Sequence, residues 1–155
     1  MNREIERKFL VLNDSFIEES YDSAGIVQGY LARDDNKVIR VRITTWLSTG
    51  MSVAQITIKA KTKDDVGEGV DEFEYMIPEE DAMLLINTCS KPLVTKIRYL
   101  VEHEGRDWEI DVFGGHKAGT IIAEIELDSM NESISLPPWV GEEVTGKKEY
   151  FNSSM

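Results

Sequence analysis

Charged residues recur two positions apart along this chain, and each pair tends to carry one sign. The pairs, in order, are Glu4 and Glu6 (followed by Lys8), Arg40 and Arg42, Lys59 and Lys61, Glu72 and Glu74, Lys96 and Arg98, Glu109 and Asp111, and Glu124 and Glu126. Residues two apart project from the same face of a β-strand, whereas in a helix they lie about 200° apart. If these segments are strands, the pattern predicts one highly charged face.

Such a face has a specific chemical use. Several Arg and Lys side chains that converge would bind a polyanion, and the planar guanidinium of Arg meets phosphate oxygens bidentately. Carboxylates on the same face would repel that anion unless divalent cations lay between them. Mg²⁺ and Mn²⁺ prefer carboxylate oxygen and also bridge phosphates. Glutamates two apart on a strand have Cβ atoms roughly 7 Å apart, so both can reach one ion. The residue types therefore predict a metal–polyphosphate site with Mg²⁺ or Mn²⁺ as cofactor.

The alternative is an ordinary solvated sheet face, which is the usual interpretation for any single strand. Two features of the whole set favour an enclosed, polar lumen instead. The pattern recurs in seven of the eight strands predicted below, and most pairs carry a single sign. A random solvent face would mix signs and contain more Ser, Thr and Asn. A plain acidic barrel without a site stays an alternative.

Period-two alternation of apolar and polar residues identifies the elements that must position these charges. It predicts strands over residues 3–11, 26–32, 37–46, 53–61, 70–77, 95–101, 106–112 and 121–127. Short helices are predicted within 13–23 and directly after Pro78, and a C-terminal segment from Pro137 is expected to close over the strands. The fold class is therefore mainly β: an eight-stranded antiparallel barrel forming a polar tunnel, with a few helices packed outside.

Length and composition restrict the remaining possibilities. The 155 residues predict a single domain over 1–155, large enough for a real core. A net charge of −12 argues against general binding to nucleic acid and to anionic membranes. No apolar run approaches the ~18 residues of a membrane helix. The start of the chain lacks the apolar core of a secretory signal, and Cys89 is the single cysteine, so a cytoplasmic protein is expected.

The order of the charged pairs resembles that of one known family. Glu4-x-Glu6-x-Lys8 at the N-terminus is weak evidence alone, but it is joined by the pairs that follow through Glu126. Together they resemble the CYTH family, also called the triphosphate tunnel metalloenzymes. The segments 5–10, 28–31 and 139–145 are similar to those of short bacterial members, and the resemblance spans Glu4 to Tyr150.

The resemblance implies roles for individual residues. The metal ligands would be Glu4, Glu6, Asp111, Glu124 and Glu126. The phosphate-binding residues would be Lys8, Arg40, Arg42, Lys59, Lys96 and Arg98. Glu72 and Glu74 would hold those cations in place, or one of them would reach a metal or water. The resemblance leaves open whether Lys61 belongs to the lumen and which of Lys147 and Lys148 lies near the tunnel mouth.

Function follows from the same resemblance, since all members bind a triphosphate with divalent cations. The predicted activity is metal-dependent hydrolysis of a small-molecule triphosphate, with inorganic tripolyphosphate favoured. The alternatives are a class IV adenylate cyclase, which converts ATP to cyclic AMP and pyrophosphate, and a non-catalytic polyphosphate or phosphoprotein binder. A homodimer is compatible with the resemblance.

Catalytic candidates are Lys96, Glu72 and Glu74. Crowding of Lys96 by other cations such as Arg98 is expected to lower its pKa, which would let it accept a proton from the attacking water. The alternative is that Lys96 is one more phosphate clamp.

Overall fold

The computed structural model describes residues 2–3, 5–64, 67–129 and 131–150, and within it the side chains of 2–3, 62–64 and 67–69 are not described. Ten strands dominate the chain: β1 (Asn2–Arg3), β2 (Ile5–Val11), β3 (Asp22–Arg33), β4 (Lys37–Trp46), β5 (Ser52–Asp64), β6 (Gly67–Ile77), β7 (Val94–His103), β8 (Arg106–Phe113), β9 (Ile121–Leu127) and β10 (Val140–Glu143). The helical elements are short: α1 (Phe16–Glu19), α2 (Glu79–Thr88) and the 3₁₀ turns η1 (Gly115–Lys117) and η2 (Lys148–Tyr150).

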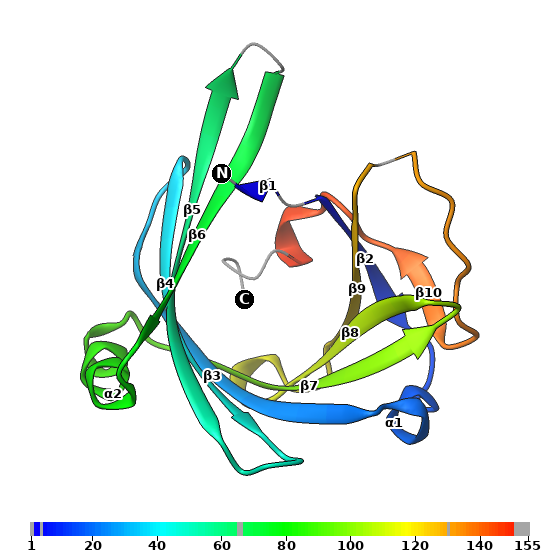
Figure 1. Ribbon diagram of the computed structural model, residues 1–155, viewed down its shortest axis with the longest axis horizontal. Coiled ribbons are helices and arrows are strands. Elements are labelled where there is room, and N and C mark those ends of the chain that lie inside the picture. Colours follow the sequence, from blue (N-terminus) through cyan, green and yellow to red (C-terminus); the bar gives the residue numbers. More distant parts are fainter. Residues whose placement is uncertain (1, 4, 65–66, 130, 151–155) are drawn as a thin grey trace.

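All ten strands belong to one antiparallel sheet, in the order β1-β6-β5-β4-β3-β7-β8-β9-β2-β10. The sheet curls into a ring (Figure 1) because its first and penultimate strands are nearly consecutive in the chain. β1 pairs with β6, with Asn2 opposite Glu72, and β2 pairs with β9, with Ile5 opposite Leu127. Among the described residues, no ladder joins β10 back to β1, so the ring is drawn together by the N-terminal segment rather than by a continuous set of hydrogen bonds.

The predicted antiparallel β fold is confirmed, and the eight predicted strands correspond to β2–β9. The helix expected within 13–23 is much shorter, because the chain pairs with β7 from Asp22 onward, opposite Leu100. The helix after Pro78 forms as α2, and no described helix is long and apolar enough to cross a membrane. The C-terminal segment contributes β10, which pairs with β2 from Val140 opposite Val11.

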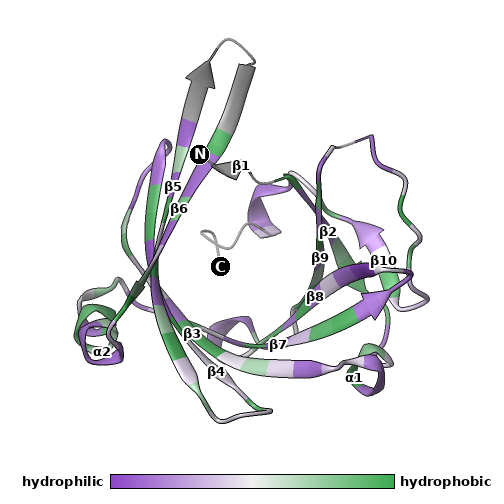
Figure 2. Cartoon of the chain, viewed as in Figure 1, coloured by the Kyte–Doolittle hydropathy of each residue, from purple (hydrophilic) through white to green (hydrophobic). Residues whose placement is uncertain are grey.

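The two larger apolar cores lie outside the ring, so the strands are hydrophobic on their outer face. A smaller cluster of Phe113, Ile122 and Val94 lies on the inner face instead, where Phe113 is opposite Lys96 and Ile122 is opposite Asp111. Hydrophilic and hydrophobic residues alternate along the strands (Figure 2). α2 places Ala82 and Ile86 against Val41 and Ala54 of β4 and β5. The end of this helix approaches β3 so closely that a Cβ at Gly29 would lie 2.7 Å from the Cβ of Cys89. Position 29 therefore requires glycine.

A larger aromatic core supports the other half of the ring. Phe16 of α1 and Trp139 pack over β2, β7 and β8, with Phe9 and Trp108 beneath them. The Trp108 and Trp139 rings are 5.8 Å apart, and both side chains are fully buried. Burial of aromatic rings of this size is a major stabilising contribution, and it fixes β2 and β8, which both contribute charged residues to the inner face.

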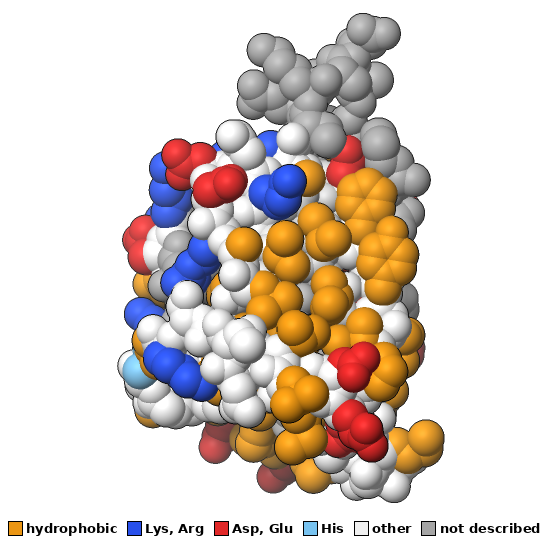
Figure 3. Space-filling view, turned by 90° about the vertical axis from the view of Figure 1, so that its left-hand side faces the viewer, with side chains coloured by type: hydrophobic (Ala, Val, Ile, Leu, Met, Phe, Trp, Pro, Cys, Tyr) orange, Lys and Arg blue, Asp and Glu red, His pale blue; other side chains and the backbone are white. Residues whose placement is uncertain are grey.

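The outer face of β6 is only partly covered. Phe73 and Tyr75 are 39 % and 58 % exposed beside α2, and Figure 3 shows hydrophobic side chains gathered on this side of the molecule.

Candidate functional site

The charged inner faces of the strands line a cavity of about 1040 Å³. Nine of the predicted site residues contribute to its wall: Glu6, Arg40, Arg42, Lys59, Glu72, Glu74, Arg98, Glu124 and Glu126. A second cavity of about 480 Å³ shares Glu6, Arg40 and Lys59 with the first and adds Lys8. The two cavities together form what we call the tunnel. Glu4 lies outside the described residues.

Strand register brings together residues that are far apart in the sequence. Glu6 lies opposite Glu126 and Lys8 opposite Glu124 across the β2–β9 ladder. Arg40 lies opposite Thr57 across β4–β5. Because directly opposite residues share one face of a sheet, these charges converge on the tunnel from both halves of the ring.

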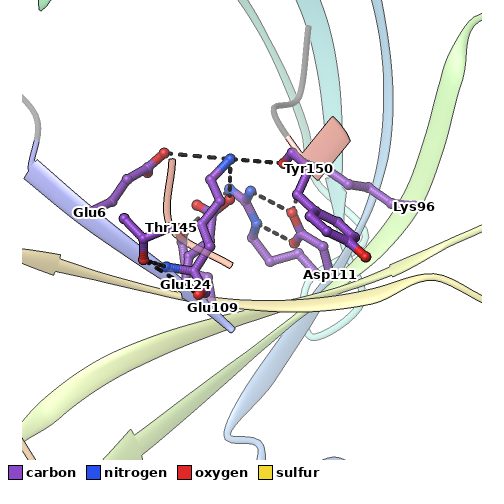
Figure 4. Close-up of polar contacts among 9 residues, drawn as sticks. Glu6, Lys96, Glu109, Asp111, Glu124, Thr145 and Tyr150 are labelled. Atoms are coloured by element: carbon purple, nitrogen blue, oxygen red, sulfur yellow. Dashed lines mark hydrogen bonds and ion pairs between the residues drawn. The ribbon is translucent and has the colours of Figure 1, made fainter. Parts of the chain in front are cut away.

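Lys96, Arg98 and Asp111 form a buried ion-pair network (Figure 4). Lys96 Nζ donates to Asp111 Oδ2 over 2.6 Å, and Arg98 donates to Asp111 Oδ1 and Oδ2 over 2.8 and 2.9 Å. Arg98 also reaches Glu109 over 3.3 Å. Asp111 is 2 % exposed and both its oxygens are occupied. In this structure it therefore acts as the counter-ion of two cations, while its expected role as a metal ligand stays a prediction.

The pKa values of this network follow from burial and pairing. The pKa of Lys96 is lowered to about 8: burial is the largest cause, Asp111 opposes it, and Arg98 and Arg42 add to the lowering. The expected depression thus has loss of water, rather than crowding by cations, as its main cause. Burial opposes ionisation of Asp111, but Lys96 and Arg98 outweigh it and hold the pKa of Asp111 well below its usual range. Burial raises the pKa of Glu109, partly offset by Arg98.

Two further arginines face the tunnel from β4. Arg42 is 8 % exposed, and burial together with Arg40 and Arg98 lowers its pKa to about 9. Its Nε donates to Gln28 over 2.8 Å. Arg40 donates to Thr57 over 3.3 Å, but its buried Nε has no hydrogen-bond partner. A buried cation with an unfilled donor is costly in isolation, and an anion in the tunnel could fill the Arg40 Nε.

The Lys8 ammonium lies between two carboxylates on the β2 side of the tunnel. Its Nζ lies 3.4 Å from Glu124 and 3.7 Å from Glu6, and it donates to the Tyr150 carbonyl over 3.2 Å (Figure 4). The C-terminal segment is held there by Thr145, whose hydroxyl accepts from the Lys8 backbone over 2.9 Å. The segment expected to close over the strands therefore contacts the tunnel wall itself.

The carboxylates of the tunnel fit a hard divalent cation in their chemistry. Glu6, Glu124 and Glu126 offer only oxygen donors, the type that Mg²⁺ and Mn²⁺ prefer, and all three line the larger cavity. Within the described part of the chain, no three such groups are already gathered around one point. A positive charge does occupy the space between Glu6 and Glu124, namely the Lys8 ammonium.

Some residues of the site had no role assigned from the sequence. Glu109 was placed on the charged face with Asp111, and its ion pair with Arg98 over 3.3 Å explains its place in the cavity wall. Thr57 lies two residues before Lys59, so the period-two pattern could have identified it. Gln28, the buried partner of Arg42, carries no charge that would identify it in the sequence. Of the residues left open, Lys61 lines the smaller cavity, whereas Lys147 is exposed and pairs with Glu142 over 3.7 Å.

Comparison with known proteins gives consistent matches across the whole chain. The CYTH domain family matches residues 2–154. A protein of Acetivibrio thermocellus named inorganic triphosphatase is 36 % identical over all of this chain and 94 % of its own length. An inorganic triphosphatase of Nitrosomonas europaea is 30 % identical over 98 % of this chain and 95 % of its own. The crystal structure of the inorganic triphosphatase NE1496 superposes with a TM-score of 0.69 at 30 % identity, covering 99 % and 94 % of the two chains.

Proposed function

Since this chain belongs to the CYTH family, we propose that it hydrolyses inorganic tripolyphosphate in its tunnel with Mg²⁺ or Mn²⁺. The observation that carries the proposal is the tunnel wall, where the buried Arg40 and Arg42 and the half-buried Lys59 face a set of carboxylates across one cavity. The relatives named inorganic triphosphatase span the chain from end to end, which supports the same substrate.

The cations bind the phosphate chain. Arg40 and Arg42 present guanidinium groups from β4, Lys59 lies on the neighbouring strand, and Arg98 faces them from β7. Charge-assisted hydrogen bonds from these groups to phosphate oxygens would replace the water lost on burial. Lys8 and Lys96 complete the proposed set, with Lys96 placed behind Arg98 through their common partner Asp111.

Glu4, Glu6, Asp111, Glu124 and Glu126 are the proposed metal ligands, and for Asp111 this role requires its exchange from Lys96 and Arg98. A bound divalent cation would neutralise phosphate oxygens and lower the pKa of a coordinated water. Without such neutralisation the glutamates around the cavity would repel the substrate, which is why we expect activity to require the metal.

Hydrolysis adds water to the terminal phosphorus, breaks the bond to the bridging oxygen and releases phosphate and pyrophosphate. A base must take the proton of the attacking water. Glu72 and Glu74 line the cavity and can contact that water directly. Lys96 has the lowered pKa of a base, but its side chain is fully buried against Asp111. These three residues are therefore the candidates for the base, and substituting each of them is expected to change the kinetics differently.

The decisive experiment incubates the protein with tripolyphosphate or with ATP, each with Mg²⁺, with Mn²⁺ and with EDTA, and measures phosphate, pyrophosphate and cyclic AMP. We expect phosphate and pyrophosphate from tripolyphosphate, and no reaction in EDTA. Cyclic AMP from ATP would identify the protein as a cyclase instead. Binding of tripolyphosphate without any product would identify a non-catalytic binder.

A further inference from the structure

A third cavity, of about 260 Å³, is lined by none of the residues proposed to bind metal or phosphate in the tunnel. We call it the β3–η1 cavity, and its described lining is Tyr30, Arg33, Ser90, Pro92, Val94, His116 and Lys117. These residues come from the end of β3, the α2–β7 connection, the start of β7 and η1. Four separate segments thus meet to form it.

The charge of this cavity is opposite to that of the chain. The protein has 29 acidic and 17 basic residues, yet among the described residues that line the cavity there is no carboxylate, while Arg33 and Lys117 are cationic. His116 and Ser90 add an imidazole and a hydroxyl, which can both donate hydrogen bonds. The larger tunnel cavity, by contrast, mixes arginines with many glutamates.

One wall of the cavity is formed by buried side chains, and one of them contacts a cation. Tyr30 is 6 % exposed and Val94 is 3 % exposed. The Arg33 guanidinium lies over the Tyr30 ring, 5.0 Å from its centroid, an arrangement that favours the cation. Tyr30 also lines the smaller tunnel cavity, so it is shared by the two sites. The β3–η1 cavity is therefore adjacent to the tunnel but has its own set of donors.

We propose that the β3–η1 cavity binds a small phosphate-class oxyanion without a divalent metal. A guanidinium fork, an ammonium and a hydroxyl around one space are suited to tetrahedral oxyanions. No metal is needed, because no lining carboxylate has to be neutralised. The volume of about 260 Å³ is below the ~300–1,000 Å³ of sites for drug-sized ligands, so a small anion fits better than a nucleotide. The proposal is independent of the activity of the tunnel.

The chain offers an internal control for a direct test, because it contains only two histidines. His116 lines the cavity, while His103 lies at the end of β7 with Ser135 3.3 Å from its Nε2. Inorganic phosphate is titrated into the wild-type protein in EDTA at constant pH and ionic strength, and the ring signals of both histidines are followed by NMR. We expect saturable shifts of the His116 ring in the millimolar range and no saturable shift of the His103 ring. Unchanged His116 signals, or equal shifts of both rings, would overturn the proposal.

Substitutions distinguish a specific phosphate site from non-specific electrostatic attraction of phosphate to the protein. Lys117→Gln removes a lining charge and is expected to weaken phosphate binding about tenfold, the effect of losing one charge-assisted hydrogen bond. Lys91→Gln is the charge-matched control: Lys91 lies between Ser90 and Pro92 in the sequence but does not line the cavity. This substitution should leave the phosphate affinity within about twofold of wild type. Equal effects of the two substitutions would contradict the proposal. Unchanged His103 signals in each variant verify that the fold is intact.

Discussion

Replacing Asp111 with Asn tests whether this carboxylate is first of all the counter-ion of two buried cations. Asp111 is 2 % exposed and accepts from Lys96 over 2.6 Å and from Arg98 over 2.8 and 2.9 Å. Asn keeps the size and shape of the side chain but removes its charge. Lys96 and Arg98 would then stay buried with their main compensating charge removed.

The structure allows the size of the effect to be worked out. Removing one partner of a buried ion pair costs about 3–5 kcal/mol. For a domain of this length, each kcal/mol shifts the melting temperature by about 2–4 °C, so the variant should melt about 6–20 °C lower. The folded-state pKa of Asp111 is depressed, because Lys96 and Arg98 outweigh its burial. The Asp111 charge therefore stabilises the fold fully above about pH 3.9, the pKa of Asp in the unfolded chain. This stabilisation is lost as the pH falls through the lower pKa of the folded state. The difference from wild type should shrink accordingly in acid.

Urea unfolding in EDTA measures this difference without a contribution from metal. Asp107→Asn is the matched control, since Asp107 lies on the same strand but is exposed, with the Tyr21 hydroxyl 3.4 Å away. It should change the free energy of unfolding by no more than about 0.5 kcal/mol. If Asp111→Asn were as stable as wild type or more stable, the counter-ion argument would be refuted. The charge of Asp111 would then give no net stabilisation to the metal-free protein.

Three further predictions concern the proposed activity. If Lys96 is the base, Lys96→Arg should reduce kcat by roughly 100-fold with little change in KM, and should remove a rise of activity with pH near 8. A normal kcat, or a raised KM alone, would make Lys96 a phosphate clamp and leave Glu72 or Glu74 as the base. Glu6→Gln and Glu126→Gln should each raise the metal concentration that gives half-maximal rate, because an amide is a poorer ligand for a hard cation, and unchanged metal titrations would exclude both as ligands. Tripolyphosphate with Mg²⁺ should raise the melting temperature more than sulfate does, by preferential binding to the native state; the absence of any shift at millimolar ligand would argue against a preformed site.

Much of the fold and of the tunnel wall could be predicted from the sequence. Period-two alternation located the strands and assigned Arg40, Arg42, Lys59 and Glu72 to one face, because side-chain direction in a strand depends only on position along it. All four line the cavity in the structure. Turn and helix signals near Pro78 were equally local, and α2 begins directly after that residue. These properties need no knowledge of which strands are neighbours.

The partners of each charge were decided by tertiary structure alone. Alternation places Asp111 on the inner face, but only the β7–β8 register puts it opposite Arg98, where it neutralises two cations. The contact between Lys8 and the Tyr150 carbonyl joins residues 142 positions apart. Burial depth, and with it the depressed pKa of Lys96, likewise depends on how the ring closes around the side chain. A strand pattern specifies a direction, whereas pairing, depth and enclosure arise from non-local contacts, which is why the ion-pair network and the β3–η1 cavity emerged only from the folded chain.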